Sequence, residues 1–270
     1  MDAVQLGPLV IPMQVALLVT SVLLAHAVAA WFRTSRGLDP GPIMWTMILI
    51  GFGAARLIFV LRHHDLYFST PMSIIDLRDG GFYDLAGLAA AYVAGTELTR
   101  RAPALRKPLA VATLVGCTFF IGGTSLNLAL TPPGAPLPSV EVRRLDGSAV
   151  SLSKFLGRPV IINLWATWCP PCRREMPALR SAQQAHPEVE FVFVNQGESV
   201  KTVESYLAAQ GLHMPNIVVD PAKQFSSRTG SSGYPTTLFY DAKGRLSLRH
   251  MGELSRATLD EKINRLLDVR

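Results

Sequence analysis

Two cysteines separated by two residues, Cys169 and Cys172, are the side chains of this 270-residue chain best suited to chemistry. Such a pair can close a small disulfide or hold one thiolate at a helix N-terminus. The apolar run 160–165 predicts a strand before the pair, and the pattern over 173–185 predicts a helix after it. At a strand-to-helix turn, free backbone N–H groups and the helix dipole favour a negative sulfur. The spacing therefore indicates thiol–disulfide redox chemistry.

Two other uses of the cysteine pair fit the sequence less well. A zinc site would need two more ligands at comparable spacing, and the third cysteine, Cys117, lies inside an apolar run where we expect a small buried hydrophobe. A purely structural disulfide at this spacing would not link distant parts of the chain. The stretch His63-His64-Asp65 could hold a metal, but adjacent histidines in a polar loop are more often solvated. We expect no metal and no cofactor beyond a redox-active Cys169–Cys172 disulfide.

The composition divides the chain in two. Residues 1–137 carry nine Lys/Arg and seven Asp/Glu, mostly between long apolar runs, whereas residues 138–270 carry seventeen and thirteen, spread evenly. The net charge of +6 includes no basic run dense enough to predict a nucleic-acid partner. The apolar runs are long enough to cross a lipid bilayer, and they cover approximately Leu9–Phe32, Pro42–Leu61, Phe82–Leu98 and Pro108–Leu130.

The distribution of positive charge predicts the orientation in the membrane. The first and third connections between the apolar runs are rich in arginine, including Arg33, Arg36, Arg100 and Arg101, so both are expected to be cytoplasmic. Both termini and the cysteine pair then lie outside the cytoplasm. A cleaved signal peptide is an alternative for the first run, but no Lys or Arg precedes it.

Strands and helices alternate around and after the cysteine pair. The predicted strands cover residues 160–165, 190–195, 216–219, 236–240 and 245–250, and the predicted helices cover residues 173–185, 200–210, 221–228 and 258–269. The last two strands flank Asp241-Ala242-Lys243-Gly244, which has the composition of a hairpin turn. The fold class expected is an α-helical membrane domain of about four transmembrane helices plus an α/β domain of thioredoxin type.

The second half resembles the membrane-tethered thioredoxin-like reductases of the TlpA/ResA type, which include cytochrome c maturation proteins. The resemblance rests on WATWCPPCRREMP at 165–177, VNQGE at 194–198 and GYPTT at 233–237. It implies a redox domain over 139–270, with Cys169 as the exposed attacking thiolate and Cys172 as the shielded resolving thiol. It also implies a cis bond before Pro235.

Four further residues are expected to contact substrate beside Pro235. Pro170 and Pro171 shape the loop between the cysteines, and Tyr234 would pair with the substrate backbone. Trp168 is expected to pack beside the disulfide with Trp165 and to form a docking surface; core burial is the alternative for both indoles.

Glu175 is a candidate for proton transfer to and from Cys172. It lies six positions after Cys169, so its side chain could return under the cysteine pair. Thioredoxins carry a buried acid in the preceding strand, where this chain has Asn163, which cannot titrate. The resemblance to ResA-type proteins therefore favours Glu175 as the proton relay. The alternative is that its charge only stabilises the start of the helix.

The membrane half, residues 1–130, resembles a degenerate prolipoprotein diacylglyceryl transferase. The resemblance covers about residues 51–95, including GAARLIFV at 53–60, but Leu85 stands where that family has an essential histidine. Arg56 lies inside the second apolar run and is either functional or paired with Asp84 or Glu97. A Pro-rich linker over 131–138 follows and is expected to hold the redox domain off the membrane.

Together these patterns predict a membrane-anchored extracytoplasmic thiol–disulfide oxidoreductase that mainly reduces protein disulfides. The resemblance implies a place in a bacterial inner membrane, apocytochrome c as a leading substrate, and a membrane electron donor of the CcdA or DsbD type. Two alternatives remain open at this stage. One is an oxidase that forms disulfides, because only the reduction potential separates the two directions. The other is a lipid-binding or lipid-transferase-derived membrane protein with an appended redox domain.

Overall fold

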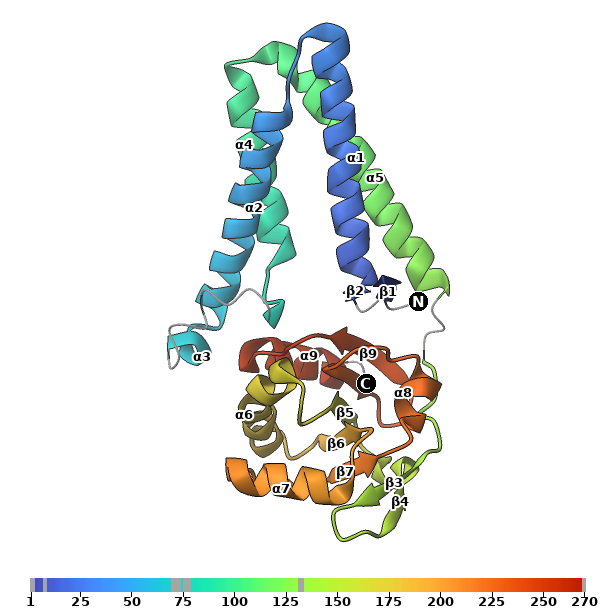
Figure 1. Ribbon diagram of the computed structural model, residues 1–270. Helices are drawn as coiled ribbons and strands as arrows, with labels where there is room; N and C mark the ends of the chain where they lie inside the picture. The colour runs from blue at the N-terminus through green and yellow to red at the C-terminus, as the bar shows by residue number, and fades with distance from the viewer. Residues whose placement is uncertain (1–2, 7–8, 69–73, 75–78, 131–133, 269–270) are drawn as a thin grey trace. The chain divides into compact units, whose positions relative to one another are not determined.

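The chain divides into two compact units, shown in Figure 1. The computed structural model describes residues 3–6, 9–68, 74, 79–130 and 134–268. The first unit comprises residues 1–75 and 81–131, and the second comprises residues 132–270 and 76–80. The first unit is helical apart from a short N-terminal hairpin, and the second is built on a mixed sheet.

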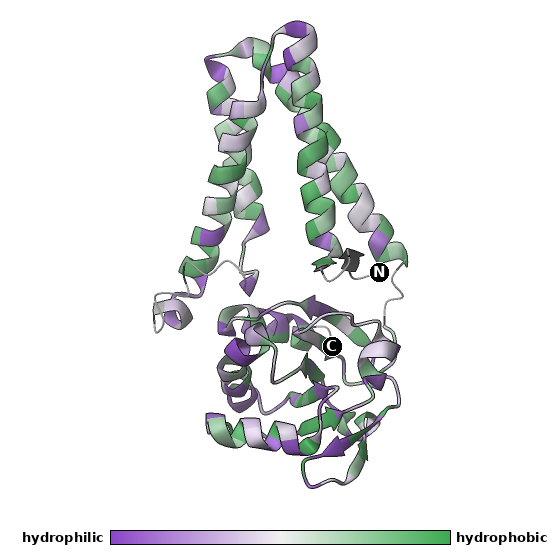
Figure 2. Ribbon diagram, in the orientation of Figure 1, coloured by the Kyte–Doolittle hydropathy of each residue, from purple (hydrophilic) through white to green (hydrophobic). Residues whose placement is uncertain are grey.

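The first unit consists mainly of four helices packed in two pairs. Its elements are β1 (Ala3–Leu6), β2 (Leu9–Pro12), α1 (Met13–Arg36), α2 (Gly41–Arg62), α3 (His64–Phe68), α4 (Asp84–Arg100), a 3₁₀ turn (Pro103–Leu105) and α5 (Arg106–Leu130). Helix α1 packs along α5, and α2 packs along α4. Figure 2 shows that hydrophobic residues dominate these helices. Among the described residues three helices are long and apolar enough to cross a membrane: α1, α2 and α5 with its preceding turn. Helix α4 has 17 residues, so a fourth span stays a prediction.

Glycine lets the two helices of each pair approach closely. A Cβ atom on Gly87 of α4 would lie 2.8 Å from the carbonyl oxygen of Gly51 and 2.9 Å from Cβ of Ala55, both in α2. A Cβ atom on Gly116 of α5 would lie 3.0 Å from the carbonyl oxygen of Ser21 in α1. Small residues at such contacts allow tight backbone packing between helices in a membrane.

The structure disfavours the ion pair expected for Arg56 and corrects the expected burial of Cys117. Arg56 is 7% exposed, and the partners that the structure gives it include two backbone carbonyls, those of Gly81 (2.8 Å) and Ile74 (3.1 Å). The expected partner Glu97 instead pairs with Arg100 at 2.7 Å. Cys117 is exposed on α5 rather than buried, because its neighbour Gly116 occupies the face that packs on α1.

The second unit is a seven-stranded sheet with helices packed against it. Its elements are β3 (Glu141–Arg144), β4 (Ala149–Ser151), a 3₁₀ turn (Leu152–Phe155), β5 (Val160–Trp165), α6 (Pro170–Ala185), β6 (Glu190–Gln196), α7 (Val200–Gln210), β7 (Ile217–Asp220), α8 (Gln224–Thr229), β8 (Thr236–Tyr240), β9 (Leu246–Met251) and α9 (Arg256–Asp268). The strand order is β4-β3-β7-β6-β5-β8-β9. Strand β5 is central, parallel to β6 and antiparallel to β8. This arrangement confirms the predicted thioredoxin-like α/β fold.

The alternation of side chains along β5 assigns each residue to one of two cores. Ile161 and Trp165 belong to the core that includes residues of α6, α7 and α9, whereas Val160, Ile162 and Leu164 belong to the core that includes Phe225 of α8. All six residues of β5 are buried. Since side chains alternate along a strand, Asn163 shares the face of Ile161 and Trp165, toward α6.

Part of the expected linker belongs to the folded second unit. Residues 131–133 lie outside the described residues, but the Leu137 N–H donates to Gly244 O at 2.8 Å and the Leu246 N–H donates to Ala135 O at 2.9 Å. Pro136 forms an antiparallel bridge with Arg245. Leu137 is only 8% exposed and packs in the core of the second unit. Its burial therefore holds this end of the expected linker against the β8–β9 hairpin.

The glycine contact between α2 and α4 makes a stability prediction. Gly87→Ala should destabilise the first unit by about 1–3 kcal/mol, because backbone atoms cannot move aside for the new methyl group. The matched control is Gly53→Ala, since nothing lies within 4 Å of a Cβ atom there. The control should be neutral or stabilising by up to about 1 kcal/mol through helix propensity. Unfolding by SDS in mixed micelles, followed by circular dichroism, measures both; equal effects would contradict the close approach.

Candidate active site

The cysteine pair lies at the connection between β5 and α6. Helix α6 begins at Pro170, three residues earlier than the sequence predicts, because Cys169 serves as its N-cap and proline is well tolerated in a first helical turn. The Cys172 N–H donates to Cys169 Sγ at 3.3 Å. Cys169 and Cys172 form a disulfide. Cys169 Sγ is therefore held where an N-cap side chain normally accepts from the first turn, a position that favours negative charge.

Both sulfur-bearing side chains are buried in the disulfide form. Cys169 is 3% exposed and Cys172 is 0% exposed, so the expectation of an exposed Cys169 is wrong for this state. The reason is packing, since both cysteines join the core cluster that contains Trp165 and Met176. Cys172 lies deeper, as expected for the shielded cysteine. The two indoles beside the pair differ: Trp165 is fully buried, whereas Trp168 is 62% exposed and is the one available for docking.

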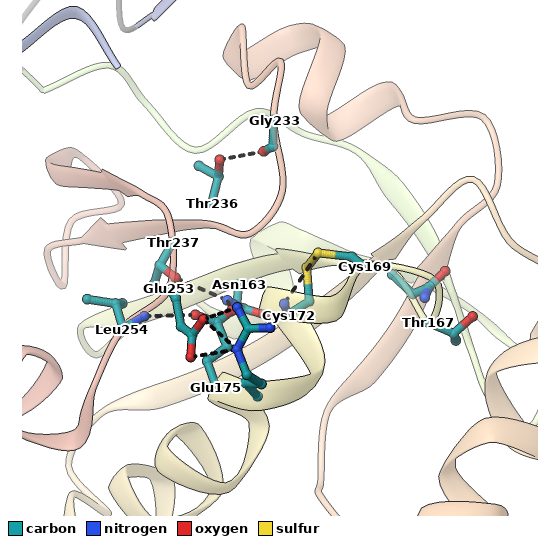
Figure 3. Close-up of a disulfide and its surroundings, with 12 residues drawn as sticks. Asn163, Thr167, Cys169, Cys172, Glu175, Gly233, Thr236, Thr237, Glu253 and Leu254 are labelled. Carbon is teal, nitrogen blue, oxygen red and sulfur yellow. Dashed lines mark hydrogen bonds and ion pairs between the residues drawn. A yellow bond between two sulfur atoms is a disulfide. The ribbon is translucent and has the colours of Figure 1, made fainter. Parts of the chain in front are cut away.

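Glu175 lies buried one helical turn beyond Cys172, as Figure 3 shows. One carboxyl oxygen accepts from Asn163 Nδ2 at 2.8 Å, and the other accepts from the Leu254 N–H at 3.1 Å. Asn163 Nδ2 also lies 3.0 Å from Thr237 Oγ1 of β8. Burial raises the pKa of Glu175 to about 8, although the two hydrogen bonds act to lower it. The carboxyl group is thus largely protonated at neutral pH and can exchange a proton near Cys172.

A turn next to β8 lies beside the cysteine pair. The Tyr234–Pro235 peptide bond is cis, as the resemblance to the reductases predicts. The ring of Tyr234 lies 6.1 Å from that of Trp168, centroid to centroid. Thr236 Oγ1 donates to Gly233 O at 2.7 Å and closes the turn (Figure 3). Trp168, Tyr234 and Pro235 are thereby brought together, with exposed Pro170 and half-buried Pro171 at the start of α6.

Glu198 fixes the loop that precedes Cys169, a role that the sequence did not reveal. Its carboxylate accepts from the Thr167 N–H at 2.7 Å, from Thr167 Oγ1 at 2.5 Å and from Asn195 Nδ2 at 2.7 Å. Charge-assisted hydrogen bonds of this kind are the stronger ones. The motif at 194–198 contained this residue, but no local pattern indicates that it bonds to a loop 31 residues earlier.

Comparisons with known proteins find relatives of the second unit. The family model named Redoxin matches residues 132–265. The thioredoxin-like protein YneN of Bacillus subtilis is 30% identical over 172 residues, which cover 59% of this chain and 98% of YneN. The thiol-disulfide oxidoreductase ResA of Halalkalibacterium halodurans is 28% identical over 56% of this chain and 86% of ResA. The crystal structure of StoA from Bacillus subtilis is 28% identical, with a TM-score of 0.41, and the match covers 48% of this chain and 98% of StoA.

Two independent lines converge on one assignment. The structure places a Cys-x-x-Cys disulfide at the N-terminus of a helix in a thioredoxin-like sheet, with a cis-proline turn beside it. The similarity to YneN reaches 30% identity over 98% of that protein. The chain belongs to the thioredoxin-like thiol–disulfide oxidoreductases.

Proposed function

We propose that this protein is a membrane-anchored, extracytoplasmic oxidoreductase that reduces disulfides in other proteins. The observation that carries the proposal is the position of the Cys169–Cys172 pair at the N-terminus of α6 with Glu175 buried behind it. The helix N-terminus favours a Cys169 thiolate, and the thiolate is the form that attacks a disulfide. The buried carboxyl group supplies a proton carrier on the side of Cys172.

The reaction that we propose has two exchange steps. The Cys169 thiolate attacks one sulfur of a substrate disulfide, forms a mixed disulfide and releases the first substrate thiolate. Glu175, in the minor fraction that is ionised at neutral pH, takes the proton of Cys172, whose thiolate attacks Cys169 Sγ and releases the second substrate thiolate. Two electrons pass to the substrate, and the Cys169–Cys172 disulfide is left. Its reduction by a dithiol donor runs these steps in reverse, with Glu175 returning the proton to Cys172.

The anchoring and partners are proposals as well. Three helices of the first unit are apolar and long enough to span a membrane, and the arginine-rich connections favour a redox domain outside the cytoplasm. A protein disulfide is the substrate class that the family implies. Apocytochrome c as the substrate, a donor of the CcdA or DsbD type and a bacterial inner membrane rest on the resemblance given above.

The membrane half is proposed to act as an anchor. Its resemblance to prolipoprotein diacylglyceryl transferases remains a prediction, and the Redoxin match begins only at residue 132. Leu85, at the position of that family's histidine, is 69% exposed on α4 and offers no group that can transfer a proton. The proton transfer that the histidine performs in that family therefore cannot be performed by the residue at this position.

The reduction potential decides between a reductase and an oxidase. We expect the Cys169–Cys172 couple to equilibrate near the thioredoxin value of about −270 mV. The measurement uses the full chain in detergent, with Cys117→Ala to remove the third thiol, equilibrated in glutathione buffers. A value near that of a strong oxidant, about −120 mV, would overturn the proposed direction and make the protein a disulfide donor.

The different positions of the two cysteines, Cys169 at the N-cap of α6 and Cys172 inside its first turn, predict different trapping. Reduced Cys172→Ser protein should accumulate a mixed disulfide with a peptide disulfide, because no second thiol resolves it. Cys169→Ser should accumulate little or none, since Cys172 lies inside the first turn of α6 rather than at its N-cap. Intact-protein mass spectrometry under non-reducing conditions, in the Cys117→Ala background, measures both adducts. Equal adduct in the two variants would contradict the assignment of Cys169 as the attacking cysteine.

Glu175→Gln should change the pH dependence of disulfide reduction. Because the pKa of Glu175 is raised to about 8, the oxidised wild type carries the carboxyl proton below that pH and loses it above. Reduction of the disulfide expels the Cys172 thiolate, which the protonated Glu175 assists and the carboxylate opposes. Wild type should therefore react faster than Glu175→Gln at pH 7, by roughly tenfold or more.

The informative quantity is the ratio of the two rate constants at each pH. The ratio cancels the titration of the small thiol used as reductant. It should fall as the pH rises through about 8, in the direction fixed by the raised pKa. Stopped-flow tryptophan fluorescence follows the reduction, and circular dichroism checks that both proteins are folded. A ratio that is constant from pH 6 to 9.5 would eliminate Glu175 as the proton carrier.

A further inference from the structure

Arg173 is an exposed cation that directly follows the cysteine pair in α6. It lies one helical turn after Cys169, and its N–H donates to Cys169 O at 3.1 Å. Residues four apart occupy the same side of a helix, so the Arg173 side chain projects on the side of Cys169. The side chain is exposed, and among the described residues no carboxylate lies within ion-pair distance of it. Its neighbour Arg174, by contrast, is paired with Glu253 at 2.7 Å.

A cation–π contact with Tyr206 positions the Arg173 guanidinium. The guanidinium carbon lies 5.6 Å from the ring centroid of Tyr206, a half-buried residue of α7. The Tyr206 ring in turn lies 5.8 Å from the ring of buried Trp165, the last residue of β5. Cation–π contact leaves the N–H donors at the edge of the guanidinium free to bond elsewhere. A side chain already held in place loses less freedom when it binds a partner.

We propose that Arg173 selects substrate disulfides that carry a carboxylate next to the attacked cysteine. This proposal rests on the proposed function, because it concerns the substrate of the same exchange. An acidic peptide is repelled by the Cys169 thiolate, and a positioned guanidinium both offsets that repulsion and donates two hydrogen bonds to the carboxylate. The exposed Trp168, which packs beside Tyr234, offers apolar surface to the rest of the peptide.

Arg173 acts here as a positioning residue that changes no bond. The covalent step stays the one described above: the Cys169–substrate S–S bond forms, the substrate S–S bond breaks, and the leaving sulfur departs as a thiolate. Arg173 keeps its proton throughout. Its effect is on the encounter and alignment of the substrate, so it should depend on the charge of the peptide and weaken with added salt.

The test compares two disulfide-bonded peptides that differ only in Glu or Gln beside one cysteine. The pre-reduced full chain in detergent, in the Cys117→Ala background, reacts with each peptide in a single turnover at low salt. We expect the Glu peptide to react about two- to five-fold faster with wild type, as for an exposed ion pair. Arg173→Gln should bring the ratio to about one or below, because the thiolate then repels the acidic peptide unopposed.

Two further variants separate position from net charge. Arg180→Gln removes one positive charge from the same helix, two turns further on, and should keep the wild-type preference. Tyr206→Leu keeps the charge but removes the ring under the guanidinium, and should reduce the preference. Loss of preference in Arg180→Gln equal to that in Arg173→Gln would overturn the proposal, as would equal rates of wild type with both peptides.

The same data distinguish failure of this inference from failure of the proposed function. Reduction of both peptides at equal rates by wild type removes the role of Arg173 and leaves disulfide reduction intact. Reduction of neither peptide overturns both, because a reductase should reduce the neutral peptide whatever Arg173 does.

Discussion

Burying the carboxyl group of Glu175 is the constraint on which the active-site architecture depends. A buried polar group is costly unless its hydrogen bonds are made. Here the partners come from separate parts of the fold: Asn163 from β5 and the Leu254 N–H from the loop before α9, with Thr237 of β8 beyond Asn163. The requirement therefore fixes α6, strands β5 and β8 and the start of α9 in one relative position, and this also fixes the position of the cysteine pair.

The helices and strands that begin and end at recognisable capping or apolar residues were predicted from the sequence. Strand β5 matches the predicted 160–165 because its run is wholly apolar apart from Asn163, and α7 matches 200–210 because Ser199 caps its start and Gly211 ends it. The start of α6 was misplaced, since a Pro-Pro pair reads as loop although proline suits a first helical turn.

Properties that depend on distant residues were beyond the sequence pattern. The burial of Cys169 reflects core packing, and the three hydrogen bonds of Glu198 join segments that no periodicity relates. In the first unit, hydropathy indicates helices but leaves open which helices pack together. The pairing follows from contacts such as Gly51 with Gly87, and Arg56 bonds to backbone carbonyls that no charge pattern can indicate.

The pairing of residues 135–137 with the β8–β9 turn has a mechanical consequence. A domain tethered at one end is pulled through the residues that first pair with the rest of its fold. Here a pull on the tether would be resisted first by the backbone bonds between Leu137 and Gly244 and between Ala135 and Leu246. Both partners belong to the hairpin segment 244–246, so tension enters the sheet there before it reaches β3. Tyr240, beside the β8–β9 turn, pairs with Val160 at the start of β5, so the strand–helix turn that carries Cys169 lies at the opposite end of that strand from the point where tension enters.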